Sequence, residues 1–259
     1  MFTSPRGALA VTLAVLYASS ALGAKAQTGT PTDDSPSNQR GSGVVTVSAN
    51  AALVTDYRFR GVSLSGGDPA VQGGLDITRA NGFYAGAWGS SIDGGESYGE
   101  IELDIYAGWT GQISNGVSLD VGIMYYSYPS EDLGLDTDYW EPYASAGFTL
   151  GPAEAKIGVA YAFDQDALAN EDNLYLYSDL STGIPGTPVT ITGHVGFTDG
   201  VQAPPYLSGT PDDTGWDWAL AANVRHGIVD LGIAYVGVEG PSIDGYTDDA
   251  VVASLSASF

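Results

Sequence analysis

The sequence predicts an all-β protein: a closed antiparallel transmembrane β-barrel of about twelve strands, with short periplasmic turns and longer extracellular loops. Three observations predict this fold. The chain ends on an amphipathic strand with an aromatic last residue, the connections between expected strands alternate between short and long, and aromatic residues gather near both strand ends. A closed barrel accounts for all three, because it leaves no unpaired strand edge inside a membrane.

The last strand is predicted from the final stretch of the chain, Asp249–Phe259. From Val251 onward the odd positions are apolar, while serines occupy positions 254, 256 and 258. This period of two is typical of a strand with one apolar face and one polar face. A terminal strand that ends in Phe is similar to the assembly signal of bacterial outer-membrane proteins. We therefore expect the barrel-assembly machinery to recognise the strand that ends at Phe259.

The first 26 residues have the features of a cleaved secretory signal peptide. Arg6 supplies a positive charge, residues 8–23 are mostly apolar or small, and Ala24-Lys25-Ala26 fits a small-x-small cleavage site. A membrane-spanning helix is the alternative, but the apolar run is short for a bilayer. We expect residues 1–26 to be removed as the chain is exported through the periplasm.

A leader precedes the barrel. Residues 27–42 are rich in Pro, Ser, Thr and Gly and lack an apolar period, which predicts a disordered periplasmic leader. Residues 43–259 are expected to form the outer-membrane barrel, and no stretch has the pattern of a long helix. The expected strands are 44–60, 70–79, 83–92, 99–112, 117–128, 139–150, 153–164, 172–182, 188–199, 215–226, 228–238 and 249–259.

The connections between these strands alternate in length. The short ones are 79–82, 113–116, 151–152, 183–187 and 227, and several contain the Asn-Gly or Gly-Pro pairs of tight turns. The long ones are 61–69, 93–98, 129–138, 165–171, 200–214 and 239–248. Short turns on one side and longer loops on the other are typical of outer-membrane barrels, which place the turns in the periplasm.

Aromatic residues on the expected lipid face form two belts, one near each end of the strands. A soluble β-sandwich with scattered aromatic residues is the alternative, but it explains neither the loop asymmetry nor the terminal Phe. Phe83 and Trp88 both favour lipid but differ in parity, so that a bulge at Gly86 or Gly89 is an option. The residues expected in the girdles are Tyr57, Phe59, Phe83, Trp109, Trp140, Phe148, Tyr161, Trp216, Trp218 and Phe259.

Composition restricts the possible functions. The chain has no Cys, which excludes disulfides and thiolate metal sites, and no cofactor is implied. The net charge is −23, and it becomes −25 when Arg6 and Lys25 leave with the signal peptide. A chain this acidic does not bind nucleic acid through phosphates, although it attracts cations. The acidic loops lack the regular spacing of an EF-hand, so no metal site is predicted.

Parity also separates a lumen face from the lipid face, because a charge on the lipid face costs about 2–4 kcal/mol near the midplane. Two interpretations of the lumen remain open. One is a water-filled pore whose carboxylates favour cations or polyhydroxylated solutes. The other is a narrow barrel plugged by its own salt-bridged side chains. The pore-lining candidates are Asp56, Arg58, Arg60, Gln72, Asp76, Glu100, Glu102, Asp104, Asp120, Glu141, Lys156, Asp179, His194, Asp217, Arg225 and Asp230.

Three segments of the first half carry specific motifs. They read VTDYRFRGVSLSGGDPAVQGGLD from Val54 to Asp76, GFYAGAWGSSID from Gly82 to Asp93, and GEIELDIYAGW from Gly99 to Trp109. Together they resemble the TorF family, whose members are classed as porins. The matching positions are Asp56, Tyr57, Phe59, Arg60, Gly61, Ser63, Pro69, Ala70, Gln72, Gly73, Asp76, Gly82, Phe83, Tyr84, Gly86, Trp88, Ser90, Glu102 and Asp104.

This resemblance covers about the first four strands. Beyond Gln112 the chain follows the family only in strand rhythm and in its terminal Phe. The resemblance implies an outer-membrane porin, but it does not supply a solute.

The matching polar residues suggest a cluster near the extracellular mouth. One hypothesis is that this cluster narrows the pore or orients solutes, and the other is that it only locks the first hairpins together. The residues concerned are Asp56, Arg58, Arg60, Gln72, Asp76, Glu102 and Asp104.

The expected function is therefore passive diffusion of small hydrophilic solutes through a bacterial outer-membrane channel, with a bias to cations. A structural or adhesin-like barrel with a plugged lumen is the alternative. A lipid hydrolase is disfavoured, because His194 is expected to point inward and His226 lies at a periplasmic turn. The expected partners are outer-membrane lipid and lipopolysaccharide, the barrel-assembly machinery and small hydrophilic solutes, and no nucleic acid is expected.

Overall fold

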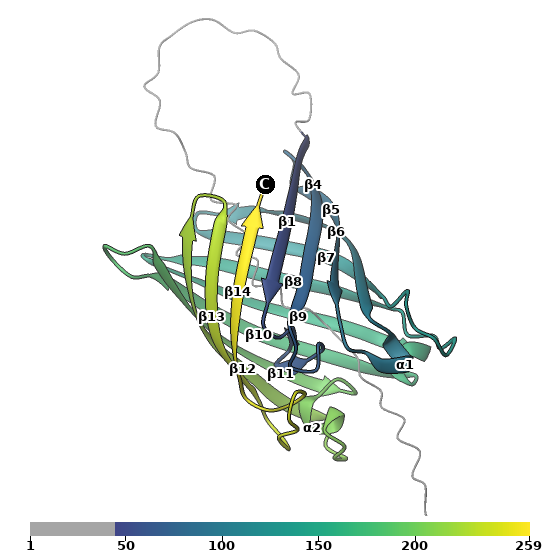
Figure 1. Ribbon diagram of the computed structural model, residues 1–259. Coiled ribbons are helices and arrows are strands. Elements are labelled where there is room, and N and C mark those ends of the chain that lie inside the picture. Colours follow the sequence, from purple (N-terminus) through teal and green to yellow (C-terminus); the bar gives the residue numbers. More distant parts are fainter. Residues whose placement is uncertain (1–44) are drawn as a thin grey trace, which may run out of the picture.

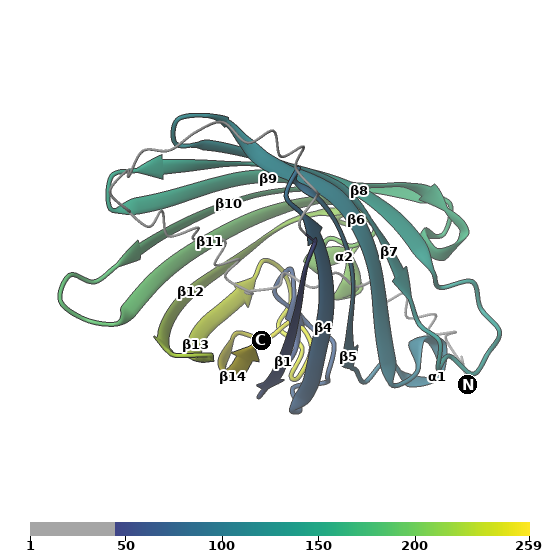
Figure 2. The same cartoon turned by 90° about the horizontal axis from the view of Figure 1, so that it is seen from above.

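The computed structural model describes residues 45–259, which form a closed antiparallel barrel (Figure 1). The predicted signal peptide, residues 1–26, and the predicted leader, residues 27–42, lie outside the described residues and stay predictions. Seen from the end that carries the chain terminus, the strands make a complete ring around an interior (Figure 2). The predicted fold class is confirmed.

Strands that are neighbours in sequence are neighbours in the ring, and β1 pairs with β14 to close it. Among residues 45–259 no helix is long and apolar enough to cross a membrane. The short helices are α1 (Gly95–Tyr98), η1 (Asp166–Leu168) and α2 (Pro204–Leu207). The barrel strands are β1 (Val45–Val54), β4 (Ala70–Arg79), β5 (Phe83–Ser91), β6 (Ile101–Ser114), β7 (Val117–Ser127), β8 (Tyr139–Leu150), β9 (Ala153–Gln165), β10 (Glu171–Gly183), β11 (Val189–Gly200), β12 (Thr214–His226), β13 (Val229–Val238) and β14 (Ala250–Ser258).

The two ends of the barrel differ as predicted. The connections at one end, here called the turn end, are short, and the C-terminus lies there (Figure 1). The connections at the other end, called the loop end, are longer and contain α1 and α2. The predicted Asn-Gly turn depends on its glycine, because Gly82 has φ +92° and a Cβ there would lie 2.2 Å from the Thr110 carbonyl oxygen.

The outer face of the barrel is apolar. Large side chains such as Val71 and Leu220 are 65% and 60% exposed, which is what a lipid-facing wall requires. Of the expected girdle residues, Phe83, Trp140, Tyr161, Trp216, Trp218 and Phe259 are exposed, and Trp109 and Phe148 are partly exposed.

The ambiguous strand is regular. β5 pairs with β4 and with β6 without a change of register, so its alternation of faces is not interrupted. Phe83 lies on the outer face, whereas Trp88 is only 3% exposed and belongs to the interior. An inward Trp88 removes the need for a bulge at Gly86 or Gly89.

The first expected strand is too long, and its end is the main correction to the prediction. β1 ends at Val54, and the backbone N–H of Thr55 still donates to the Ala253 carbonyl oxygen of β14 at 3.0 Å. The chain then leaves the wall and folds inward as residues 55–69, here called the inserted hairpin. It contains the short paired strands β2 (Arg58–Phe59) and β3 (Val62–Ser63).

The inserted hairpin reaches both sides of the lumen. Arg60 bonds to Glu141 on β8, and Gly61 packs against Val238 on β13. Tyr57 and Phe59, expected in the outer girdle, are only 4% and 2% exposed, so that part of the prediction is wrong. Strand parity places them outward only if the wall continues to residue 60, and it does not.

Candidate functional site

The tip of the inserted hairpin is fixed by a buried arginine. The Arg60 guanidinium donates to Glu141 Oε1 and to Gln202 Oε1, both at 2.8 Å, and its carbon lies 4.0 Å from the centre of the Tyr175 ring. Burial lowers the pKa of this group, but the Glu141 carboxylate and the surrounding tyrosines together outweigh burial, and the pKa of Arg60 is raised above its ordinary value. The tip is therefore held by an ion pair with β8, a hydrogen bond to Gln202 and a ring contact with β10.

The backbone at this tip makes a tight reversal. Arg60 and the following Gly61 have φ +44° and +81°, the left-handed conformations that two-residue hairpin turns use. A Cβ at position 61 would lie 2.2 Å from Val238 Cγ1. Only glycine lets the turn approach β13 so closely.

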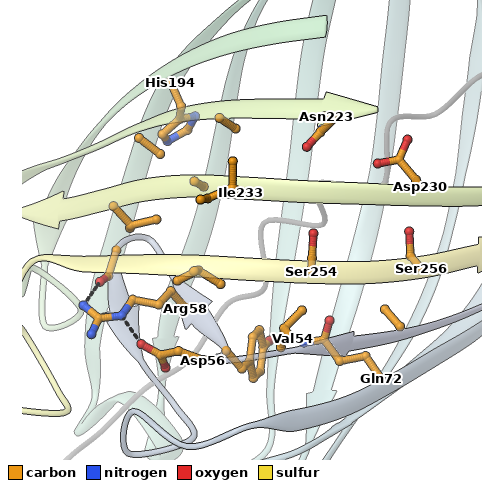
Figure 3. A pocket seen from close by; sticks show the side chains of 18 of the residues that line it. Val54, Asp56, Arg58, Gln72, His194, Asn223, Asp230, Ile233, Ser254 and Ser256 are labelled. Carbon is orange, nitrogen blue, oxygen red and sulfur yellow. Dashed lines mark hydrogen bonds and ion pairs between the residues drawn. The ribbon is translucent and has the colours of Figure 1, made fainter. Parts of the chain in front are cut away.

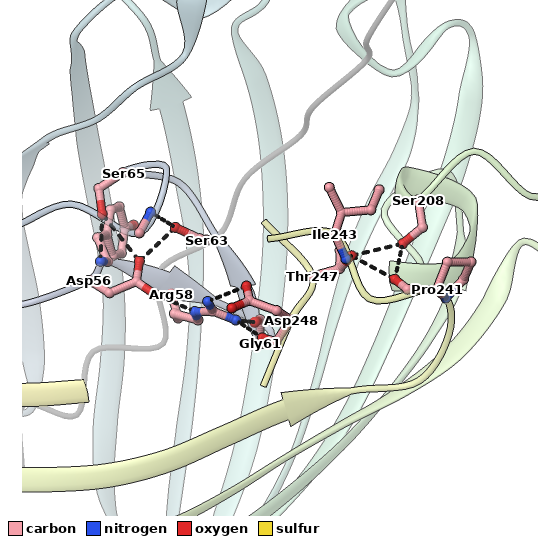
Figure 4. A network of polar contacts seen from close by, with 12 residues as sticks. Asp56, Arg58, Gly61, Ser63, Ser65, Ser208, Pro241, Ile243, Thr247 and Asp248 are labelled. Carbon is pink, nitrogen blue, oxygen red and sulfur yellow. Dashed lines mark hydrogen bonds and ion pairs between the residues drawn. The ribbon is translucent and has the colours of Figure 1, made fainter. Parts of the chain in front are cut away.

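A second arginine ties the hairpin to the last long loop, residues 239–249. Arg58 Nε donates to Asp56 Oδ2 at 2.6 Å, and Arg58 Nη2 donates to Asp248 Oδ1 at 2.9 Å (Figure 4). Asp56 also accepts hydrogen bonds from the hydroxyls of Ser63 and Ser65. The Arg58 and Asp56 side chains are 4% and 7% exposed, so their pair is sheltered from solvent, whereas the Asp248 side chain is 28% exposed. We call Asp56, Arg58 and Asp248 the seal.

Large buried side chains from β5, β7, β8 and β10 fill the part of the lumen next to the inserted hairpin. Beneath the hairpin, Tyr126 stacks on Tyr139 with ring centres 4.6 Å apart, and Tyr57 meets Trp88 edge to face at 5.6 Å. Tyr175 is 1% exposed. These contacts leave little room between hairpin and wall, and this region is called the filled half.

Several other predicted pore-lining residues contact tyrosines of the wall, and Lys156 among them is exposed. Asp120 accepts a hydrogen bond from Tyr84 at 2.6 Å, Asp76 accepts one from the Tyr106 hydroxyl, and the Lys156 ammonium lies 5.5 Å from the Tyr177 ring centre. The two carboxylates on β6, Glu102 and Asp104, are 0% and 2% exposed. Glu141 pairs with Arg60, while Glu100 precedes β6 and is exposed.

A histidine on β11 lies between two aspartates, one on each neighbouring strand. His194 Nδ1 is 2.6 Å from Asp179 Oδ1, and its Nε2 is 3.0 Å from Asp217 Oδ1. The Tyr175 hydroxyl lies 2.9 Å from the same Nε2. Because Arg60 lies over the other part of Tyr175, one chain of contacts runs from the hairpin tip to β12.

The other half of the lumen is hollow. A cavity of about 180 Å³ extends along β12, β13, β14 and β1, from the hairpin to Ser258 near the turn end (Figure 3). We call this region the hollow half. The predicted pore-lining residues that border the cavity are Asp56, Arg58, Arg60, Gln72, His194, Asp217, Arg225 and Asp230. The predicted residues that do not border it are Asp76, Glu100, Glu102, Asp104, Asp120, Glu141, Lys156 and Asp179.

The carboxylates that border this cavity are each paired with a base. Asp56 pairs with Arg58 and Asp217 with His194, as described above. Asp230 lies 3.4 Å from Arg225, in a pair whose arginine is 41% exposed. The cavity wall therefore lacks the excess of negative charge that the whole chain has.

A second hollow lies on the far side of the seal. It has a volume of about 390 Å³ and is bordered by the hairpin, the 239–249 loop and the first residues of β14. Asp56 and Arg58 border both this outer hollow and the cavity of the hollow half. The seal is therefore a wall that the two spaces share.

Sequence reasoning missed several residues of this site. Asp248 and Gln202 contact the hairpin across 190 and 142 positions of the chain, and no local pattern links residues so distant. The serines of β14 were predicted on a polar face, which was the available signal for their place in the cavity wall. Within residues 45–259, no three His, Cys, Asp or Glu side chains are grouped so as to hold a metal ion.

Comparison with known proteins gives one family and a set of similar folds. A family model described as "Bacterial protein of unknown function (Gcw_chp)" matches residues 38–259. The comparison with curated proteins finds no match. The TorF name is not the name of this family model and stays a prediction.

Solved barrels of outer-membrane proteins have a similar fold. A KdgM porin in complex with disordered oligogalacturonate aligns with TM-score 0.53 and 8% identity, over 83% of this chain and 98% of that one. The COG4313 outer membrane channel from Pseudomonas putida F1 aligns with TM-score 0.47 and 11% identity, over 87% and 99%. At these identities the KdgM alignment establishes a shared fold alone, and the weaker alignment adds no argument.

Proposed function

The chain belongs to the Gcw_chp family of bacterial proteins of unknown function, and we propose that it is a channel of the bacterial outer membrane that admits small solutes by passive diffusion. The observation that carries the proposal is the position of the seal, with the cavity on one side of Asp56 and Arg58 and the outer hollow on the other. A channel in its closed state needs a path for solutes that is blocked at a contact able to move, and the seal is such a contact. A barrel with only a structural role needs neither hollow.

The outer face supports a location in the outer membrane. The wall is closed, exposes large apolar side chains, and carries aromatic residues such as Phe83 and Trp140 at its two ends. This arrangement supports a periplasmic turn end and an extracellular loop end. A catalytic activity is not part of the proposal.

The two hypotheses for the motif residues apply to different arginines of the inserted hairpin. Arg60 is paired deep in the filled half, which supports a role in locking the hairpin to β8. Arg58 borders both hollows, which supports a role in narrowing the path. We propose that solutes pass along the hollow half and that opening requires movement of the seal.

The expected cation bias also belongs to the proposal. The net charge of −23 supports a preference for cations at the acidic loops, where fixed charge raises the local cation concentration. The paired carboxylates along the cavity support only a weak preference inside the barrel. Hydrophilic solutes remain the expected cargo at the level of the whole channel.

A plugged structural barrel is the second candidate, and one observation favours it. The inserted hairpin is buried from Asp56 to Ser65 apart from the partly exposed Arg58, and it is bound to several parts of the molecule, as the plug of an inert barrel would be. The two candidates differ in whether the seal ever opens.

Single-channel recording in a planar bilayer with a salt gradient separates them. The wild-type barrel is expected to give discrete, small conductance steps with a reversal potential that favours cations. Arg58→Ala is expected to increase the conductance by about severalfold, because it removes both side-chain ion pairs of the seal. Arg79→Ala, at the exposed end of β4 near a periplasmic turn, is the matched control and leaves the conductance unchanged. If neither the wild type nor Arg58→Ala conducts, the plugged structural barrel is the candidate that remains.

A further inference from the structure

We propose that the cavity of the hollow half is a binding chamber for a small uncharged solute with a compact apolar body, of the size of a single aromatic ring. This inference rests on the proposed function and deepens it, because it assigns a solute class to the path along β12–β14 and β1. It differs from the expectation of a polar lumen, in which charged side chains would select ions.

The chamber wall near the seal is made of small apolar side chains. Ala219 and Ala221 on β12, Val236 on β13 and Val252 on β14 occupy inward positions and border the cavity. Ala219, Ala221 and Val236 are at most 8% exposed. A hydrated ion gains no ligand from such a wall. A solute with an apolar surface gains from being transferred there.

The size of the chamber limits the solute. Its volume of about 180 Å³ is close to that of the apolar cavity of about 150 Å³ that holds benzene in an engineered protein. One six-membered ring with a short substituent fits this space.

The two ends of the chamber are polar or aromatic, so the solute needs one polar group. At the hairpin end the Tyr57 and Trp88 rings border the space, and aromatic edges and faces pack well against a flat ring. Toward the turn end, Asn223 and Ser254 offer neutral hydrogen-bonding groups. Because the charges at the border are already paired, these neutral groups suit a hydroxyl better than an ionised group.

The test is isothermal titration calorimetry of the full folded barrel in lipid nanodiscs, with the heat of empty nanodiscs subtracted. Benzyl alcohol is the apolar probe and glycerol the polyhydroxylated one. Ala221→Phe fills the chamber, and Ala253→Phe places the same ring on the exposed lipid face of β14 as the matched control. We expect benzyl alcohol to bind the wild type and Ala253→Phe saturably and to bind Ala221→Phe at least about tenfold more weakly. Glycerol should give no saturable heat.

Equal binding of benzyl alcohol to all three proteins would overturn the inference, since the probe would then report the lipid. Saturable glycerol binding that Ala221→Phe abolishes would also overturn it, in favour of a polyhydroxylated solute. Should Ala221→Phe fail to fold, the double variant Val236→Thr with Val252→Thr keeps the volume of the wall and makes it polar. It is expected to weaken benzyl alcohol binding, and unchanged binding would count against the chamber.

Failure of the channel and failure of the chamber give different results. Saturable binding of benzyl alcohol by a barrel that never conducts would support the binding chamber and contradict the proposed channel function. Conductance without saturable binding would retain the channel and remove the chamber.

Discussion

The two halves of the lumen are built from the same alternating strands but with different inward side chains. On β5 to β8 and on β10 the inward positions carry many tyrosines and buried charges, and the inserted hairpin packs against them through Arg60 and Tyr57. From β12 to β14 and on β1 they carry mostly Ala, Val, Ser and Asn, together with Asp217, Arg225 and Asp230, and a cavity remains. The comparison teaches that the size of the inward residue, rather than the number of strands, decides where this barrel is closed and where it is hollow.

The largest expected effect compares an ion pair from each half. Arg60→Ala leaves Glu141, whose side chain is 1% exposed, without its cation, and should lower the free energy of unfolding by about 3–5 kcal/mol. Arg225→Ala breaks the Asp230 pair in the hollow half, where the arginine is 41% exposed, and should cost at most about 1 kcal/mol. Denaturant unfolding in lipid vesicles measures both. Similar losses for the two variants would break the comparison.

Packing gives the next largest contrast. Tyr126→Ala in the filled half removes a ring that is 1% exposed and stacked on Tyr139, at an expected cost of about 3 kcal/mol. Val252→Ala in the hollow half borders existing empty space, so its expected cost is below about 1 kcal/mol. The same unfolding assay applies. A Val252→Ala loss as large as that of Tyr126→Ala would mean that the hollow half is as tightly packed as the filled half.

A third prediction concerns the place where the hairpin touches the hollow half. Gly61→Ala adds a Cβ that would meet Val238, at a residue with φ +81°, and should destabilise the barrel by about 2 kcal/mol while increasing its conductance. Gly186→Ala, at φ +78° in a turn where a Cβ meets no atom within 4 Å, isolates the backbone cost. The hairpin contact is measured by the difference between the two variants. Equal effects on conductance would show that the approach to β13 does not position the seal.

The smallest effect under ordinary conditions involves the loop that holds Asp248. Burial raises the pKa of Tyr246 to about 12, and its carbonyl oxygen accepts a hydrogen bond from the Ser63 N–H at 2.8 Å. The neutral phenol is therefore favoured in the docked loop, whose stability is complete below the ordinary tyrosine pKa of about 10 and is lost as the pH rises toward 12. Conductance should accordingly rise between pH 10 and 12 in the wild type, and this rise should shrink in Tyr246→Phe. An identical rise in both proteins would exclude Tyr246 as its origin.

Much of this fold follows from local pattern. The ranges of β4 to β14 are predicted to within two residues, because each strand alternates and each turn carries its own Gly or Pro signal. The outward and inward faces of these strands are fixed by the same alternation. Even the serines of β14, which border the cavity, were expected on a polar face.

The failures lie where the chain leaves that pattern. Tyr57 and Phe59 alternate as a strand would, yet Thr55 is the last residue on the wall, and nothing in the local sequence marks that departure. The contacts that make the departure favourable, such as Arg58 with Asp248, come from the opposite end of the chain. A list of lumen carboxylates likewise could not say that Asp217 faces a histidine while Asp120 faces a tyrosine.

The seal joins the first connection of the barrel to the last one, and this has a consequence for how the molecule is made. Arg58 and Asp248 are 190 positions apart, so their contact forms only after nearly the whole wall is in place. The join between β1 and β14 covers only Asn50–Val54 of β1, fewer pairs than any other two neighbouring strands of the barrel wall share. We expect this short join and the seal to complete together as the last step of assembly. A barrel trapped before that step would conduct ions through its incomplete wall. Low conductance would therefore indicate that assembly is complete.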